Sequence, residues 1–83
     1  MKETDVRIVV VAGGFVFVGE YEEKEKYVHL SATSCIRRWG TTKGLGELVN
    51  GPTKETILDP AGLVSIPIGQ MLFNIKCSSK WPL

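Results

Sequence analysis

The side chains best suited to binding chemistry gather in the middle of the chain, between Cys35 and Gly46. They are two arginines, a tryptophan, two threonines and a lysine: Arg37, Arg38, Trp39, Thr41, Thr42 and Lys43. A guanidinium can hold a phosphate while an indole ring stacks on a base. Glycines let backbone N–H groups approach an anion, and hydroxyls and a lysine add donors and charge. The stretch therefore predicts a site for an anionic, nucleotide-like ligand.

The pattern differs from the two common phosphate-binding motifs. The order G-x-x-x-x-G-K-[ST] is absent, and the dinucleotide fingerprint needs a βαβ unit that this chain does not offer. Strand alternation puts Arg37 on the same face as Cys35 and Trp39, and Arg38 on the face of Ile36. The alternative interpretation is structural: Trp39 is a core residue, the stem of Arg37 covers it, and the glycines form a turn.

Catalytic and metal-binding patterns are weak. His29 is the one histidine and has no partners in a recognisable triad order. His29, Cys35 and Cys77 could supply three zinc ligands, but their spacing matches no common zinc motif. Four of the nine carboxylates cluster in the polar stretch Glu20–Glu25, where solvent keeps them from general acid–base work. We therefore expect a protein that is not an enzyme and that holds no metal or cofactor.

Length and composition predict one domain covering residues 1–83. The net charge is +1, so no overall field favours nucleic acid or an anionic membrane. Two cysteines are too few for a secreted disulfide scaffold, and we expect no signal peptide and no membrane span. These features predict a cytoplasmic protein with reduced thiols, with a bridge between Cys35 and Cys77 as the alternative.

The hydrophobic pattern predicts short β-strands and one helical turn. The expected strands cover residues 6–12, 15–21, 26–30, 35–39, 55–58, 63–68 and 71–77. A charged hairpin tip is expected at 20–26, and tight turns are expected at 13–14, 59–62 and 69–70. The first of these is apolar almost throughout, which indicates that both of its faces are covered. Leu45, Leu48 and Val49 have helical spacing, Thr42 could cap the turn, and Gly51 could end it. We also expect Trp81 and Leu83 to pack on the protein or on a second subunit. The fold class predicted is mainly β: a small antiparallel β-sandwich or barrel with one short helical turn.

Read as a whole, from Val6 to Cys77, the chain resembles a family of short, uncharacterised phage and prophage proteins. The residues that carry the resemblance are Gly19, Ile36-Arg37-Arg38-Trp39, Gly44-Leu45-Gly46-Glu47-Leu48, Val64-Ser65-Ile66-Pro67 and Phe73-Asn74-Ile75-Lys76-Cys77. The loop Gly40-Thr41-Thr42-Lys43 is more polar than the aromatic-rich stretch found there in that family. The resemblance implies a phage origin and no established catalytic residues. It also implies action by sequestering a host molecule, such as a cyclic nucleotide or an ADP-ribose-type defence signal.

The leading hypothesis is thus a non-enzymatic, homo-oligomeric phage-type protein that sequesters an anionic nucleotide-like ligand through Arg37, Trp39, Thr41, Thr42 and Lys43. Arg38 would serve the opposite face or a neighbouring subunit. The alternative is a phage protein–protein interaction or structural module that inhibits a host protein. A small nucleic-acid-binding barrel is a third possibility, which the near-zero net charge disfavours.

Overall fold

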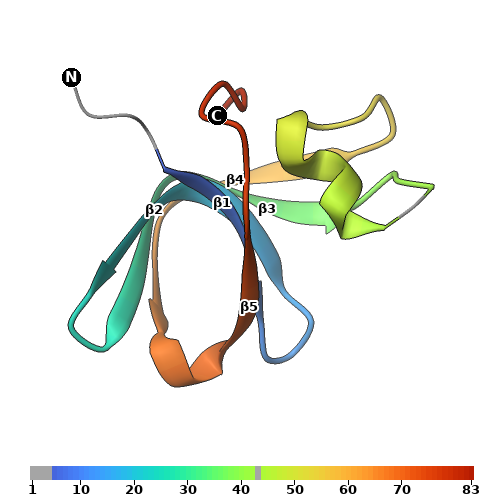
Figure 1. Ribbon diagram of the computed structural model, residues 1–83. Helices are drawn as coiled ribbons and strands as arrows, with labels where there is room; N and C mark the ends of the chain where they lie inside the picture. Colours follow the sequence, from blue (N-terminus) through green and yellow to red (C-terminus); the bar gives the residue numbers. More distant parts are fainter. Residues whose placement is uncertain (1–4, 43) are drawn as a thin grey trace.

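A computed structural model describes residues 5–42 and 44–83 of the chain. It contains five β-strands and two short 3-10 helices (Figure 1). In chain order these are β1 (Val6–Val11), β2 (Val16–Lys24), β3 (Tyr27–Arg38), η1 (Leu45–Asn50), β4 (Ile57–Pro67), η2 (Ile68–Gln70) and β5 (Met71–Lys76). All strand pairs are antiparallel, and the order across the single sheet is β4-β3-β2-β1-β5. The predicted mainly β class with a short helical turn is confirmed.

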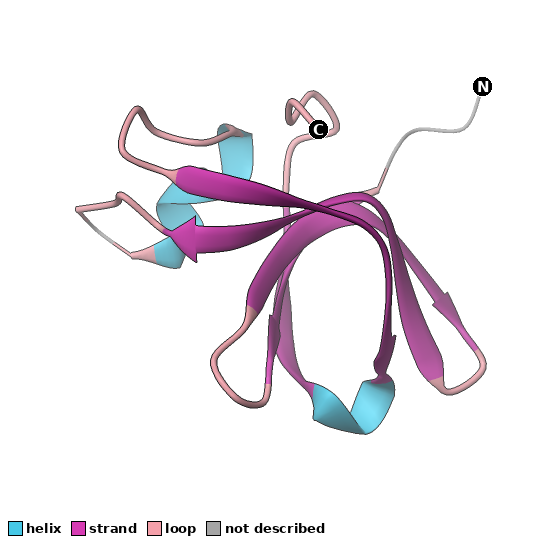
Figure 2. Ribbon diagram, turned by 180° about the vertical axis from the view of Figure 1, so that it is seen from behind, coloured by secondary structure: helices cyan, strands magenta, loops and turns pink. Residues whose placement is uncertain are grey.

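The sheet curls strongly, with η1 and the C-terminal segment at one end and η2 at the other (Figures 1 and 2). Its sharpest irregularity lies between β2 and β3. Val18 pairs with Ser34 and Glu20 pairs with Ser31, so β3 carries one extra residue there. Ala32 has a positive φ of 50°, as expected for a bulge that bends the strand. The strand continues through this bend as far as Arg38.

The sheet carries two apolar clusters, one on each of its faces. The first contains Val6, Ile8, Val16, Val18, Ile36, Leu45, Leu48, Cys77 and Trp81. The second contains Val9, Val11, Val28, Leu30 and Ile66. Alternate residues of β1 contribute to the two clusters, so both faces of this strand are covered, as its apolar sequence predicted. The curl of the sheet encloses the second cluster, while η1 and the C-terminal segment cover the first.

The C-terminal segment is held on η1 by two hydrogen bonds. The indole Nε1–H of Trp81 donates to the Leu48 carbonyl at 2.6 Å, and the Ser78 N–H donates to the Val49 carbonyl at 2.7 Å. Trp81 is buried, whereas Leu83 is 46% exposed. The expectation that Trp81 packs on the protein is confirmed. None of the described helices has the length and apolar character that crossing a bilayer requires.

Three predicted boundaries were wrong because strand pairing extends through polar and bent residues. The charged stretch Glu20–Lys24 is not a hairpin tip: it pairs with Tyr27–Ser31, and the turn is confined to residues 25 and 26. Residues 26–30 and 35–39 are not separate strands, since β3 runs through both. Likewise Asp59–Gly62 is part of β4, which follows the bend of β3 with its own register shifts. Five strands therefore replace the six or seven short ones predicted, and β2, β3 and β4 have 9, 12 and 11 residues.

A buried hydroxyl at the bulge gives a testable stability prediction. Thr33 is 3% exposed, and its Oγ1 has no hydrogen-bond partner within residues 5–42 and 44–83. Replacing Thr33 by Val removes an unpaired polar atom while keeping the branched shape, so we expect the free energy of unfolding to rise by about 1 kcal/mol. Urea denaturation measures the change. Thr33→Ala is the control, because it also removes the hydroxyl but leaves a small cavity; a Val variant less stable than the Ala variant would contradict the prediction.

Candidate ligand-binding site

The backbone after β3 is held in place by the loop that precedes β4. The Thr56 hydroxyl donates to the Trp39 carbonyl at 2.7 Å, and the Thr53 hydroxyl donates to the Gly40 carbonyl at 2.7 Å. Gly40 has φ 65°, and a Cβ added there would lie 2.4 Å from the Glu55 carbonyl carbon. Only glycine fits this contact. The two loops are thus fastened to each other at Trp39 and Gly40.

The side chain of Trp39 is nevertheless 42% exposed, in contrast to Trp81, which is 4% exposed. Tryptophan is usually well buried, and an exposed one on a fixed backbone loses little freedom when it binds a partner. The structural alternative for Trp39, a core position, is therefore not what the fold shows. Ile36 is buried in the first cluster, which confirms the predicted alternation at this end of β3.

Arg37 lies on an exposed face of the sheet and forms an ion pair. Its Nε donates to Asp59 Oδ2 at 2.8 Å, and the two side chains are 63% and 49% exposed. Asp59 is paired with Cys35 across β3 and β4, so Cys35, Arg37 and Asp59 share this face. A guanidinium carries five N–H donors, and the bond to Asp59 engages one of them. Arg38 is also exposed and is paired with Ile57.

The remaining predicted residues lie in the loop between β3 and η1. Thr41 is half-buried and Thr42 is exposed. The Thr42 N–H donates to Glu47 Oε2 at 2.9 Å. The side chain of Thr42 does not cap η1, because the N-cap residue is Gly44 and no side-chain capping bond is formed. Lys43 lies outside the described residues. The predicted phosphate cradle of loop amides is thus replaced at Thr42 by an internal contact.

Two phenylalanines that sequence reasoning left out lie on the same face as Arg37. Phe17 is paired with Cys35, so its side chain shares the face of Cys35 and Arg37. The Phe15 ring stacks on Phe17 with a centroid distance of 6.4 Å, and Phe15 is 59% exposed. Because the two strands are antiparallel, Phe15 and Arg37 lie on the same side of the Phe17–Cys35 pair. The alternation of Phe15 and Phe17 was visible in the sequence, but their pairing with Cys35 was not.

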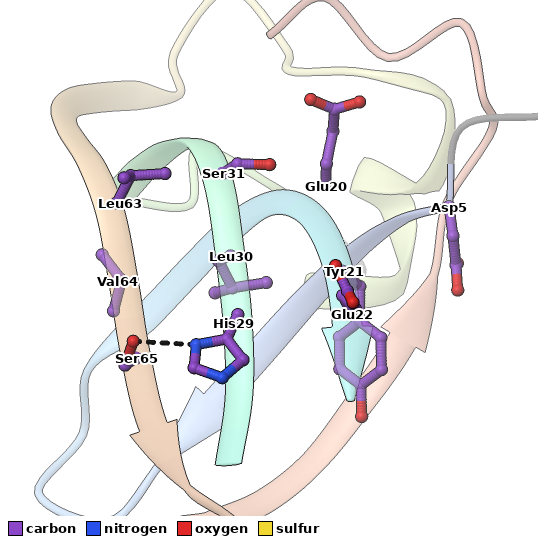
Figure 3. A pocket seen from close by; sticks show the side chains of 10 residues that line it. All are labelled: Asp5, Glu20, Tyr21, Glu22, His29, Leu30, Ser31, Leu63, Val64 and Ser65. Atoms are coloured by element: carbon purple, nitrogen blue, oxygen red, sulfur yellow. Dashed lines mark hydrogen bonds between the residues drawn. The ribbon is translucent and has the colours of Figure 1, made fainter. Parts of the chain in front are cut away.

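A shallow pocket lies elsewhere, on the outer face of β2, β3 and β4 (Figure 3). Its lining residues are Asp5, Glu20, Tyr21, Glu22, His29, Leu30, Ser31, Leu63, Val64 and Ser65. The His29 Nδ1 and Ser65 Oγ are 2.9 Å apart and hydrogen-bonded, and the His29 ring also stacks on Tyr27. None of the predicted site residues lines this pocket. Its three carboxylates disfavour the anionic ligand that the sequence predicted.

In a polar cluster beside this pocket, the side chains around Arg7 contact one another. Arg7 pairs with Asp5 at 3.0 Å, donates to Asn74 Oδ1 at 3.1 Å, and lies 4.3 Å from the centroid of the Tyr21 ring. The hydrogen bond to Asp5 raises the pKa of Arg7. Burial and then the hydrogen bond to Glu23 raise the pKa of Tyr21. These contacts join the start of β1 to β2 and β5, so the cluster is part of the framework.

The thiols and carboxylates do not assemble a metal site in the described part of the chain. No group of three His, Cys, Asp or Glu residues with suitable geometry occurs among the described residues. Cys35 and Cys77 are both free thiols. Cys77 belongs to the first buried cluster, and burial raises the pKa of its thiol.

Comparisons with known proteins found no relative of this chain. No family model, no curated protein and no solved structure matches this chain. The site must therefore be interpreted from its own geometry.

Proposed function

We propose that the protein is a non-catalytic binding module that sequesters a planar, anionic, nucleotide-like molecule on the surface around Trp39. The observation that carries the proposal is the exposed Trp39 ring on a backbone fixed by Thr53 and Thr56. A ring held in this way is a preorganised stacking surface. The phage origin implied by the resemblance fits a role as a sponge for a host defence signal.

The neighbouring side chains supply the groups that such a ligand needs. Arg37 is exposed beside Trp39 and can donate to phosphate oxygens, while Arg38 is exposed on the opposite face and would serve a neighbouring subunit. Thr41 and Thr42 place hydroxyls in the adjoining loop. Phe15 offers a second exposed ring on the face of Arg37. Base stacking on an aromatic ring contributes about 1–3 kcal/mol, which is enough for weak binding by one ring and tighter binding when arginines contact the phosphate.

Titration with a nucleotide panel tests the proposal. Calorimetry with mononucleotides, cyclic dinucleotides and ADP-ribose should give heat with at least one member, and the bound molecule should be recovered unchanged after denaturation. Tryptophan fluorescence should be quenched in the wild-type protein and in Trp81→Phe, but not in Trp39→Leu. If no member of the panel produces heat, or if quenching persists in Trp39→Leu, the proposed site is wrong.

Substitutions of the two partners in the Arg37–Asp59 ion pair should change ligand affinity in opposite directions. Arg37→Ala should weaken ligand binding about 10- to 100-fold, because a charge-assisted hydrogen bond to the anion is lost. Asp59→Asn should strengthen binding about two- to fivefold, because the anion no longer competes with a carboxylate for the guanidinium. Calorimetry measures both constants. Lys24→Ala, at the far end of β2, is the matched control for lost positive charge and should leave binding unchanged. If Lys24→Ala and Arg37→Ala weakened binding equally, the ligand would be attracted by nonspecific charge and not by a site at Arg37.

A second candidate is the protein–protein interaction module. It is favoured by four large apolar side chains that are more than half exposed: Phe15, Leu63, Leu72 and Phe73. Leu72 and Phe73 are neighbours on the edge strand β5, and exposed apolar side chains that lie close together are typical of protein contacts. Capture of a single host protein at a fixed stoichiometry, with no nucleotide bound, would favour this function over sequestration.

A further inference from the structure

The two edges of the sheet differ in how well they are protected against strand pairing. β4 forms one edge, and it contains Pro60, Pro67 and a left-handed Gly62 with φ 71°. Prolines and register irregularities are the usual means of blocking an exposed edge. β5 forms the other edge and contains neither proline nor glycine; its one register shift lies between Met71 and Phe73, and its one charged residue is Lys76, the last of the strand. The β5 edge is therefore the one available to another strand.

The backbone groups that face outward on β5 follow from the ladder with β1. The Cys77 N–H donates to the Val6 carbonyl at 2.8 Å. Hydrogen-bonded and non-hydrogen-bonded pairs alternate in an antiparallel ladder. Arg7 and Lys76, and then Val9 and Asn74, are consequently non-hydrogen-bonded pairs. The N–H and C=O groups of Asn74 and Lys76 thus point away from β1, toward the free edge.

The side chains of β5 make this edge self-complementary. Phe73 is paired with Val10 and Ile75 with Ile8, so both lie on the face of the first apolar cluster. Phe73 is 51% exposed and the neighbouring Leu72 is 64% exposed. When a second β5 runs antiparallel with Asn74 opposite its own copy, Phe73 of each chain lies opposite Ile75 of the other. The two Lys76 residues are then at opposite ends of the pair, so no like charges meet.

We propose that β5 pairs with β5 of a second copy of this chain, giving a twofold-symmetric dimer with one continuous ten-stranded sheet. The pairing satisfies the outward N–H and C=O groups of Asn74 and Lys76 and joins the apolar residues Phe73 and Ile75 across the axis. The strand has six residues, about 20 Å, so the contact is at the small end of specific interfaces and the dimer dissociates on dilution. This inference does not depend on the ligand proposed for the Trp39 surface.

A proline at Lys76 is the sharpest test. Lys76→Pro removes an N–H that points outward and so breaks no hydrogen bond within the sheet, whereas Lys76→Ala keeps that N–H while losing the same charge. Sedimentation equilibrium over a concentration series should show dimer for the wild type and for Lys76→Ala. It should show a dissociation constant at least tenfold higher for Lys76→Pro. Equal association of the proline and alanine variants would overturn the proposal.

A second variant keeps the test decisive if the proline disturbs the fold. Phe73→Lys changes a half-exposed side chain and places a charge opposite Ile75 of the other copy, so it should also weaken the dimer at least tenfold while circular dichroism stays unchanged. A wild-type protein that is monomeric at every concentration overturns the proposal. So does a trimer or larger ring, because a twofold pair of β5 strands closes at two copies. Nucleotide binding measured on the same variants reports separately on the Trp39 surface.

Discussion

Replacing Gly40 by Ala is expected to destabilise the protein by more than about 4 kcal/mol, the largest effect of any single-methyl change we anticipate. The added Cβ would lie 2.4 Å from the Glu55 carbonyl carbon and 2.5 Å from the Thr56 nitrogen, both backbone atoms. The φ of 65° adds a left-handed penalty of about 1–2 kcal/mol. The loops can relieve the contact only by moving apart, which breaks the bonds from Thr53 and Thr56 to the 39–40 backbone.

Thermal and urea denaturation measure this effect, and Gly62→Ala is the matched control. Gly62 has a similar φ of 71°, but among the described residues no atom beyond its own chain neighbours lies within 4 Å of its added Cβ, so its substitution should cost only the left-handed penalty. The difference between the two variants isolates the contact with the 53–56 loop. Equal losses of stability in both variants would show that Gly40 and Glu55 are not in contact. If Gly40→Ala folds at low temperature, it should also bind nucleotides more weakly, because Trp39 is no longer held.

Trp81 is the second position with a large expected effect. Trp81→Ala should lower the free energy of unfolding by about 3–5 kcal/mol, since it removes a buried ring from the first apolar cluster. Trp81→Phe keeps most of the ring volume but removes the Nε1–H donor at 2.6 Å, while the Leu48 carbonyl keeps its bond from the Gly51 N–H, so the change should cost about 0.5–1.5 kcal/mol. The C-terminal segment and η1 should loosen together in both variants, which hydrogen exchange can follow.

The other tryptophan supplies the control for this prediction. Trp39 is 42% exposed, so Trp39→Ala should cost less than about 1 kcal/mol of stability while removing the stacking surface. The two tryptophans would then separate stability from binding. Loss of Trp81 lowers the stability of the fold, and loss of Trp39 abolishes the quenching of tryptophan fluorescence by the ligand. A larger loss of stability in Trp39→Ala than in Trp81→Ala would reverse the roles that the structure assigns to them.

The sequence alone determined the class of fold and the strongest of its elements. The β-branched run in β1 predicted a strand covered on both faces, and Gly13-Gly14 predicted the turn after it, where both residues have positive φ. The apolar spacing of Leu45 and Leu48 predicted the helical turn, and Gly51 marked its end. These features depend on periodicity and on the conformational limits of single residues, which neighbours in the sequence are sufficient to reveal.

Tertiary structure decided the strand boundaries and the surroundings of the candidate site. Lys24 belongs to β2 because Tyr27 pairs with it, and Asp59 belongs to β4 because Cys35 pairs with it; neither residue shows a strand pattern by itself. The extra residue at Ala32 also changes which face the following side chains occupy, since a shift of one residue reverses the alternation. This shift brings Phe17, Cys35 and Asp59 to one face and leaves Arg37 paired with a carboxylate distant in sequence. Such contacts arise from long-range register, which local sequence patterns do not encode.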